Sequence, residues 1–155
     1  MNTLINDANT IIQASIQSVL PDAAVKRALT NKTFTGKIVV IAVGKAAWTM
    51  ANAAKEILGD CIHTGIVLTK YNHSQGNIDG FRILEAGHPL LDQNSIESTA
   101  EIISAVSNLS IEDSVILLLS GGGSALFEKP AGNLELSDIL SVTEKLLACG
   151  ADIVE

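Results

Sequence analysis

Three short stretches of this sequence combine glycine with side chains that can bind anions. They read "GK" at 44–45, "GHP" at 87–89 and "SGGGS" at 120–124. Lysine and histidine can carry positive charge, and serine hydroxyls can donate hydrogen bonds to oxyanions. Each stretch directly follows an apolar run of the kind that forms a buried strand, so together they indicate a site for a carboxylate or a phosphate.

The triple glycine is the strongest of these signals. Gly121, Gly122 and Gly123 have no side chains, so their amide groups can turn toward a ligand and form an anion-binding nest. Ser120 and Ser124 flank the glycines and supply hydroxyl groups. The alternative is a tight turn in which the glycines only allow the backbone to pack closely.

Lys45 is the candidate catalytic residue, because its ammonium group can neutralise charge on a transferred group. It follows Gly44 at the start of an expected helix, where the helix dipole disfavours a cation. A solvated surface lysine is the alternative. His88 could bind an anion, orient a substrate hydroxyl or transfer a proton, or it could only hydrogen-bond within its own loop before Pro89.

Several established motifs are absent from the sequence. The stretch "VGKAA" lacks the first glycine and the Ser/Thr of a Walker A loop, and "GKAAWT" lacks the glycines of a dinucleotide fingerprint. Ser124 is not followed by the second glycine of an esterase nucleophile elbow, since Leu126 stands there. The three histidines have no suitably spaced cysteine or carboxylate partners, so no metal site is predicted.

Alternating strands and helices must position these loops. Apolar runs predict strands at 38–43, 64–70, 81–86 and 114–119, with amphipathic helices between them. This order predicts an α/β fold: a doubly wound, mostly parallel, three-layer Rossmann-like sheet with helices on both faces. In such a sheet the loops that follow the strands share the carboxyl edge, where ligands bind.

Helical periodicity predicts helices at 3–19, 23–29, 46–58 and 136–149 and one before the fourth strand. For the last of these, Asn94 and Glu97 predict a capping box, and Asp92 is expected to help start the helix. Its buried face is predicted to contain Ile96, Ala100, Ile103 and Val106.

The composition limits the class of protein. The 155 residues suit one domain, and 47% hydrophobic residues with only 3% aromatics indicate an aliphatic core. A net charge of −7 disfavours nucleic acid and anionic membranes as partners, and no apolar run is long enough to span a bilayer. Two distant cysteines and a start without a leader-like pattern lead us to expect a cytoplasmic setting.

Four motifs, in order, resemble the N-terminal portion of the glycerate 2-kinase family, some members of which are labelled hydroxypyruvate reductase. They are "VGKAA" at 43–47, "GIVLTKYNH" at 65–73, "GHPLLDQNS" at 87–95 and "LLSGGGSALFEKP" at 118–130. The resemblance implies phosphorylation of glycerate to 2-phosphoglycerate by ATP with Mg²⁺, in a cleft between two α/β domains. It also implies that Lys45 is the family's key lysine and that residues 120–124 are its anion loop.

The sequence departs from the family pattern at Asn72 and Leu91, which replace a usual glycine and a usual proline, and it is less than half as long as a typical member. We therefore expect residues 1–155 to form one incomplete α/β domain, the N-terminal part of the family's N-terminal domain, with the C-terminal domain absent. The chain alone is expected to bind anions weakly and to have little or no kinase activity. A complementing C-terminal half or a homodimer would be its protein partner.

Two other functions stay open on the sequence. Hydroxypyruvate reduction with a nicotinamide cofactor is one, although the missing dinucleotide fingerprint disfavours it. The other is a non-catalytic sensor of sugar phosphates or other anions that dimerises through its first helix.

Overall fold

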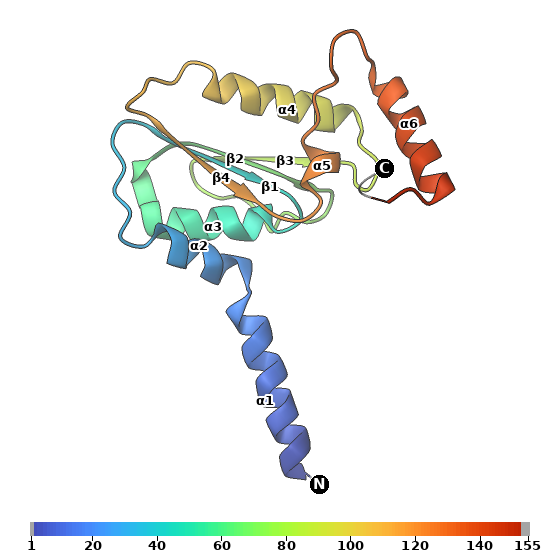
Figure 1. Cartoon of the computed structure of the whole chain (residues 1–155). Helices are drawn as coiled ribbons and strands as arrows, with labels where there is room; N and C mark the ends of the chain where they lie inside the picture. The colour runs from blue at the N-terminus through green and yellow to red at the C-terminus, as the bar shows by residue number, and fades with distance from the viewer. Residues whose placement is uncertain (1, 153–155) are drawn as a thin grey trace.

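Four parallel strands form the centre of the structure, a computed structural model that describes residues 2–152 (Figure 1). The elements follow one another as α1 (Asn2–Ser18), α2 (Pro21–Leu29), β1 (Ile38–Val43), α3 (Ala47–Leu58), η1 (Gly59–Cys61), β2 (Ile62–Lys70), β3 (Phe81–Ala86), α4 (Gln93–Val106), β4 (Ser114–Leu119), α5 (Gly123–Leu126) and α6 (Leu136–Cys149).

The strand order is β3-β2-β1-β4, and every neighbouring pair is parallel. Val43 at the end of β1 pairs with Leu68 in β2 and Leu119 in β4, so these strands finish at one edge of the sheet. The predicted α/β class is confirmed. Three predicted strands have the observed bounds, and β2 begins two residues earlier than predicted, at Ile62 instead of residue 64.

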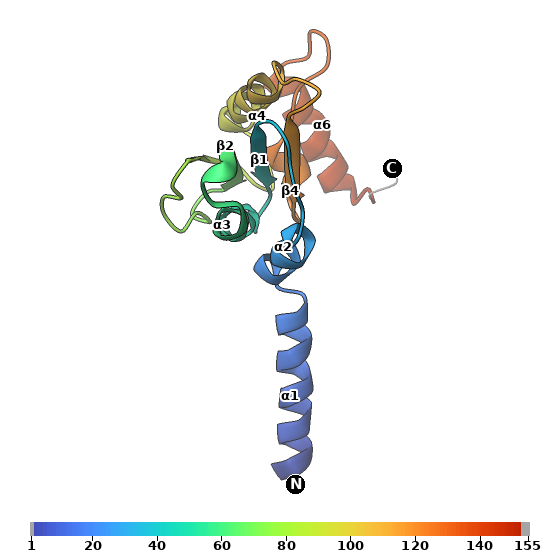
Figure 2. The ribbon, with the colours of Figure 1, turned by 90° about the vertical axis from the view of Figure 1, so that its left-hand side faces the viewer.

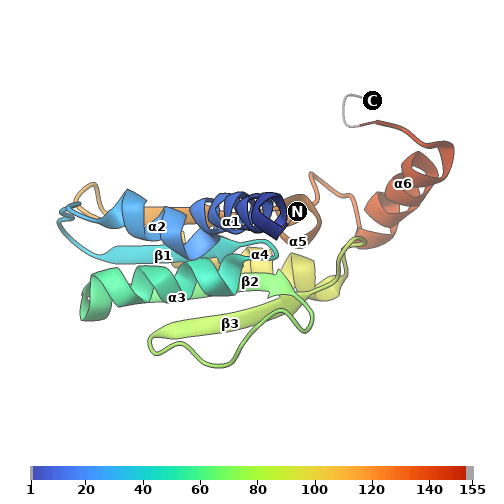
Figure 3. The ribbon, with the colours of Figure 1, turned by 90° about the horizontal axis from the view of Figure 1, so that it is seen from below.

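Helices cover the two faces of the sheet unequally. The α2 and α3 helices pack on one face, and α4 and the short α5 pack on the other (Figures 1 and 3). Because side chains alternate along a strand, Val40 and Ala42 of β1 face α3, whereas Ile41 and Val43 face the α4 and α5 side. This double covering explains why the β1 sequence is apolar throughout.

The β4 strand lies at an edge of the sheet and is covered on one face only. Leu118 is buried, but Val115, Leu117 and Leu119 are 48%, 59% and 63% exposed. These three residues pair with buried residues of β1 and point toward the same face of the sheet as α4. The apolar run predicted a buried strand, but within residues 2–152 the side chains on one face of β4 are exposed.

The start of α4 differs from the sequence-based prediction. Asp92 is the N-cap: its side chain accepts a hydrogen bond from the Ser95 amide, and the Ser95 side chain bonds back to the Asp92 backbone. The capping box predicted at Asn94 and Glu97 is therefore wrong, because the helix begins at Gln93, before Asn94. The prediction that Asp92 helps to start the helix is confirmed.

The buried face of α4 also differs. The residues that the structure buries are Ser95, Ser98, Thr99 and Ile102. Of the four predicted, Ala100 is exposed and Ile96, Ile103 and Val106 are half-buried. Small side chains bring α4 close to the sheet and to α5, since Thr99 Oγ1 accepts a hydrogen bond from the Glu128 amide at 3.0 Å.

Two helices stand apart from the layered body. The α1 helix projects away from α2 (Figure 2), and its described side chains, residues 3–18, are all exposed. The α6 helix, which ends at Gly150 as predicted, has no buried residue. Within residues 2–152, no helix has both the length and the apolar character that a membrane crossing requires.

Candidate functional site

Gly122 brings the three glycine-containing loops together at the carboxyl edge of the sheet. A Cβ atom added to Gly122 would lie 2.8 Å from Nε2 of His88 and 3.2 Å from Cε of Lys45. Its φ of +87° is in the left-handed region that glycine adopts without strain. The loops after β1, β3 and β4 therefore converge, as expected for a parallel sheet.

The loop after β4 is fastened to the turn after β1. The Ser120 hydroxyl accepts a hydrogen bond from the Ala46 amide at 3.0 Å and donates to the Val43 carbonyl at 3.3 Å. The Lys45 amide donates to the Gly121 carbonyl at 3.0 Å. The Ser120 hydroxyl is thus engaged by the main chain, whereas Ser124 is exposed.

The three glycines of the loop differ in exposure: Gly121 is exposed, Gly122 is half-buried and Gly123 is buried. Within residues 2–152, no protein acceptor receives a hydrogen bond from the amides of Gly121, Gly122 or Gly123. The amides at the start of a helix have no partner inside it, and Gly123 is the first residue of α5. These groups can therefore serve as the donors of the predicted anion-binding nest.

Lys45 supplies a positive charge beside these amides. Its side chain is exposed, and none of the four ion pairs between described residues includes it. The preceding residue, Gly44, has φ +116°, and a Cβ atom there would lie 2.6 Å from the Ser120 carbonyl oxygen. Gly44 therefore permits the tight turn that places Lys45 next to the glycine loop.

His88 is half-buried and, like Lys45, lies next to Gly122. Burial lowers the pKa of its imidazole below 6.5, and the nearby charges of Lys45 and Lys70 lower it further. The ring is accordingly neutral near pH 7 and offers one donor and one acceptor nitrogen. An anion bound beside it would raise this pKa, because negative charge favours the protonated ring.

Sequence reasoning missed Tyr71, which steadies the loop that carries His88. Tyr71 Oη donates to Asp92 Oδ2 at 2.6 Å and accepts from Asn94 Nδ2 at 2.9 Å. Burial alone would raise the pKa of Asp92, but hydrogen bonds from Tyr71, Gly87 and Ser95 lower it overall. A tyrosine directly after a predicted strand was the available signal, but its partner could not be read from the sequence.

The segment after β2 reaches the same site. His73 Nδ1 lies 3.4 Å from the Lys45 carbonyl oxygen, and Asn72, which replaces a usual glycine of the family, has a positive φ of +62°. His63 is exposed near the start of β2, at the opposite end of that strand. Of the three histidines, His73 and His88 thus lie close to Lys45.

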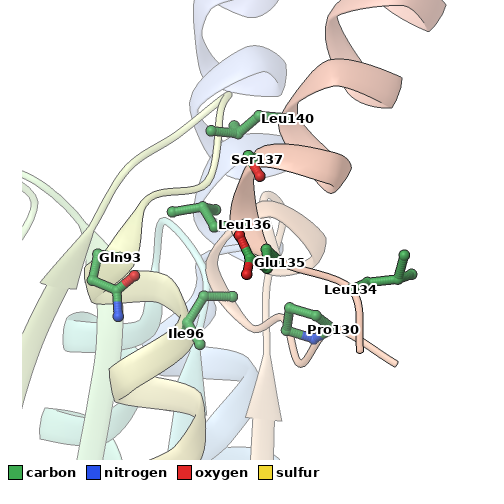
Figure 4. A pocket seen from close by; sticks show the side chains of 8 residues that line it. All are labelled: Gln93, Ile96, Pro130, Leu134, Glu135, Leu136, Ser137 and Leu140. Carbon is green, nitrogen blue, oxygen red and sulfur yellow. The ribbon is translucent and has the colours of Figure 1, made fainter. Parts of the chain in front are cut away.

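A separate groove of about 580 Å³ lies between the N-terminal ends of α4 and α6 (Figure 4). The residues that line it are Gln93, Ile96, Pro130, Leu134, Glu135, Leu136, Ser137 and Leu140. It contains no lysine, arginine or histidine, so it lacks the positive charge that the carboxyl edge provides. We therefore place the candidate site at Gly122 and not in this groove.

The fold is an open, parallel α/β domain in which a glycine-rich loop, Lys45 and His88 meet at the carboxyl edge of the sheet. The chain belongs to the family described as "Domain of unknown function (DUF4147)", which it matches over residues 7–155.

Individual relatives have more specific names. A D-glycerate 2-kinase from Thermotoga maritima is 49% identical over 145 residues, which are 94% of this chain and 34% of the relative. A glycerate 2-kinase from Pyrococcus horikoshii is 42% identical over 77% of this chain and 27% of the relative. The resemblance to the N-terminal portion of the glycerate 2-kinase family is thereby confirmed.

The same likeness is found in three dimensions. A crystal structure of glycerate kinase from Thermotoga maritima matches with a TM-score of 0.90 and 46% identity, covering 99% of this chain and 37% of that chain. The chain therefore spans about one third of the length of the relatives that it matches.

Proposed function

We propose that this chain is part of an ATP-dependent glycerate 2-kinase, a transferase that converts glycerate to 2-phosphoglycerate. The observation that carries the proposal is the convergence of Lys45, His88 and three free glycine amides at Gly122. The names of the two glycerate 2-kinase relatives from Thermotoga maritima and Pyrococcus horikoshii support it, and they concern proteins about three times as long.

Each group at the site has a distinct task in this proposal. The amides of residues 121–123, with the Ser124 hydroxyl, hold an anionic group of a substrate, and Lys45 offsets charge on the phosphoryl group as it moves. His88, neutral near pH 7, orients an oxygen by hydrogen bonding. Phosphoryl transfer depends mainly on positioning and electrostatics, which these groups provide.

The nucleotide and its metal ion belong to the same proposal. Within residues 2–152 there is no group of three or more His, Cys, Asp or Glu side chains that could hold a metal ion. We therefore propose that Mg²⁺ enters with ATP, on the phosphate oxygens. The base that takes the proton from the C2 hydroxyl is assigned to the polypeptide beyond these residues.

We also propose that residues 1–155 form the first part of an N-terminal α/β domain, in a cytoplasmic enzyme. The exposed face of β4 and the unburied α6 support a protein partner. A complementing C-terminal part is the favoured partner because the matched relatives are about three times as long. A homodimer through α1 is the alternative.

The test is to measure 2-phosphoglycerate formation from ATP and glycerate, with the chain alone and with the remaining two thirds of the Thermotoga maritima relative. We expect almost no turnover from the chain alone and turnover from the reconstituted complex. Lys45→Ala should lower that turnover by about 100-fold, the usual scale for losing a group that stabilises transferred charge. Full turnover with Lys45→Ala, or robust turnover by the chain alone, would contradict the proposal.

The two other functions are tested in parallel with the same preparations. Oxidation of NADH or NADPH by hydroxypyruvate without ATP, lost in Lys45→Ala, would favour a reductase. Thermal stabilisation by sugar phosphates but not by ATP or glycerate would favour a sensor.

A further inference from the structure

A second lysine, Lys70, ends β2 on the face of the sheet where α5 begins. Ile66 and Leu68 point toward that face, because they share a core cluster with Leu126 of α5. Side chains alternate along a strand, so Lys70 continues this row at the carboxyl edge. It therefore lies on the side of the sheet that the glycine loop enters.

Lys70 is half-buried, and it has no ion-pair partner among residues 2–152. Two lysines of the described residues form ion pairs, Lys26 with Glu56 and Lys55 with both Asp60 and Asp79. Because no carboxylate of the described residues pairs with it, the Lys70 ammonium group can bind an anion.

Two carboxylates at this end of the sheet, those of Asp92 and Glu85, are engaged by other groups. Asp92 accepts hydrogen bonds from Tyr71 and Ser95. Glu85 accepts from the Ser74 amide at 3.0 Å, and it alternates with Leu84 and so points to the opposite face from Lys70. Lys45, Lys70 and His73 all contribute positive charge around His88 and lower its pKa. Several cationic side chains thus lie at one edge of the sheet in a chain whose net charge is −7.

We propose that Lys70 binds the anionic ligand together with Lys45 and the glycine amides, and that this ligand is a chain of phosphates. The inference rests on the proposed function and identifies which substrate this edge holds. Glycerate carries one carboxylate, which Lys45 and the amides alone could satisfy. Two unpaired ammonium groups from neighbouring strands match a ligand with several negative charges, such as the phosphates of a nucleotide.

The experiment measures the dissociation constants of inorganic tripolyphosphate and of glycerate by calorimetry at low ionic strength. The variants are Lys70→Gln, Lys45→Gln and Lys32→Gln. The last is the matched control, since it removes one charge from an exposed lysine in the loop before β1, at the opposite edge of the sheet. Lys70→Arg keeps the charge, and circular dichroism establishes that each variant is folded.

We expect Lys70→Gln to weaken tripolyphosphate binding by about five- to tenfold, the effect of one charge near the ligand in a solvated site. Lys32→Gln should change it by less than about twofold because distant charges are screened. The dissociation constant of tripolyphosphate for Lys70→Arg should stay within about twofold of that for the unaltered chain, because arginine keeps the charge. The dissociation constant of glycerate should change by less than about twofold in Lys70→Gln, because Lys45 and the glycine amides alone could satisfy its single carboxylate.

Each failure has a distinct meaning. Suppose that Lys45→Gln weakens tripolyphosphate binding but that Lys70→Gln and Lys32→Gln have the same dissociation constant for tripolyphosphate. The role proposed for Lys70 is then wrong, and the proposed function stands. If Lys70→Gln weakens glycerate binding as much as tripolyphosphate binding, the assignment to phosphates is wrong. If neither Lys45→Gln nor Lys70→Gln differs from the control, or if the unaltered chain binds no tripolyphosphate, both proposals fail.

Discussion

Strands β1 and β4 have almost the same apolar character but different environments. The β1 sequence "IVVIAV" is buried along its whole length, with every residue no more than 5% exposed. The β4 sequence "SVILLL" pairs with it residue for residue, yet only Leu118 is buried. Position in the sheet, and not composition, makes this difference.

The described residues cover both faces of the sheet at β1 but only one face at β4. Helices α3, α4 and α5 and two neighbouring strands enclose β1. Beside β4 the chain instead leaves through α5 toward α6, which stands away from the sheet (Figure 1). An apolar row of this size normally meets another surface, and the relatives contain about twice as much further polypeptide to supply one.

The largest expected effect contrasts one acidic substitution in each strand. Val40→Asp places an unpaired charge in the core and should unfold the chain, at a cost above about 4 kcal/mol. Leu117→Asp, at an exposed position, should change stability by less than about 0.5 kcal/mol. Urea denaturation followed by circular dichroism measures both, and equal effects would remove the distinction between the strands.

A second prediction concerns the junction between β1 and the loop after β4. Gly44→Ala combines an unfavourable φ with a Cβ atom 2.6 Å from the Ser120 carbonyl oxygen, and should cost about 2–3 kcal/mol. Gly59→Ala is the matched control: its φ is also positive, but no atom lies within 4 Å of the added Cβ. It should cost about 1 kcal/mol, and equal losses in urea midpoints would show that the junction is not tight.

A third prediction concerns Tyr71, which follows β2 and donates a hydrogen bond to Asp92 at the start of α4. Tyr71→Phe removes the hydrogen bond to Asp92 and should destabilise the chain by about 1 kcal/mol. It should also raise the pKa of Asp92, because one of the groups that lower it is lost. Carboxyl NMR titration measures the pKa, and an unchanged value would show that the tyrosine does not support the loop.

The smallest effect is a change in acid sensitivity at the start of β4. The amides of Ser110 and Lys37 donate to Asp113 and lower the pKa of its carboxyl group below 3.8. Its stabilising contribution is therefore present above the usual aspartate pKa and is lost as pH falls through the lowered value. Asp113→Asn should make the urea midpoint less dependent on pH below about pH 5, and an unchanged slope would contradict this.

The fold could largely be predicted from the sequence because apolar runs end at clear boundaries such as Gly44 and Ser120. The existence of α4 was also predicted, but its capping box and its buried face were not. Asp92 and Asn94 are both good caps, so the sequence alone did not decide between them. Periodicity also selected the more apolar row of Ile96 and Ala100, whereas the sheet receives a row of small polar residues.

The convergence of three loops followed from the parallel order of the strands, which places their ends at one edge. What the sequence did not provide was the direction of single side chains. The engagement of Ser120 by the main chain, the contact of Tyr71 with Asp92 and the unpaired state of Lys70 depend on tertiary geometry. These contacts could therefore be identified only from the structure.

The most direct test of the anion site is the pKa of His88, measured by NMR with and without ATP. The exposed His63, at the opposite end of β2, serves as the internal control. We predict that the His88 pKa lies below 6.5 in the free chain and rises when ATP binds, while the chemical shifts of His63 at a fixed pH do not respond to ATP. A His88 pKa that is unaffected by saturating ATP would contradict an anion site at Gly122.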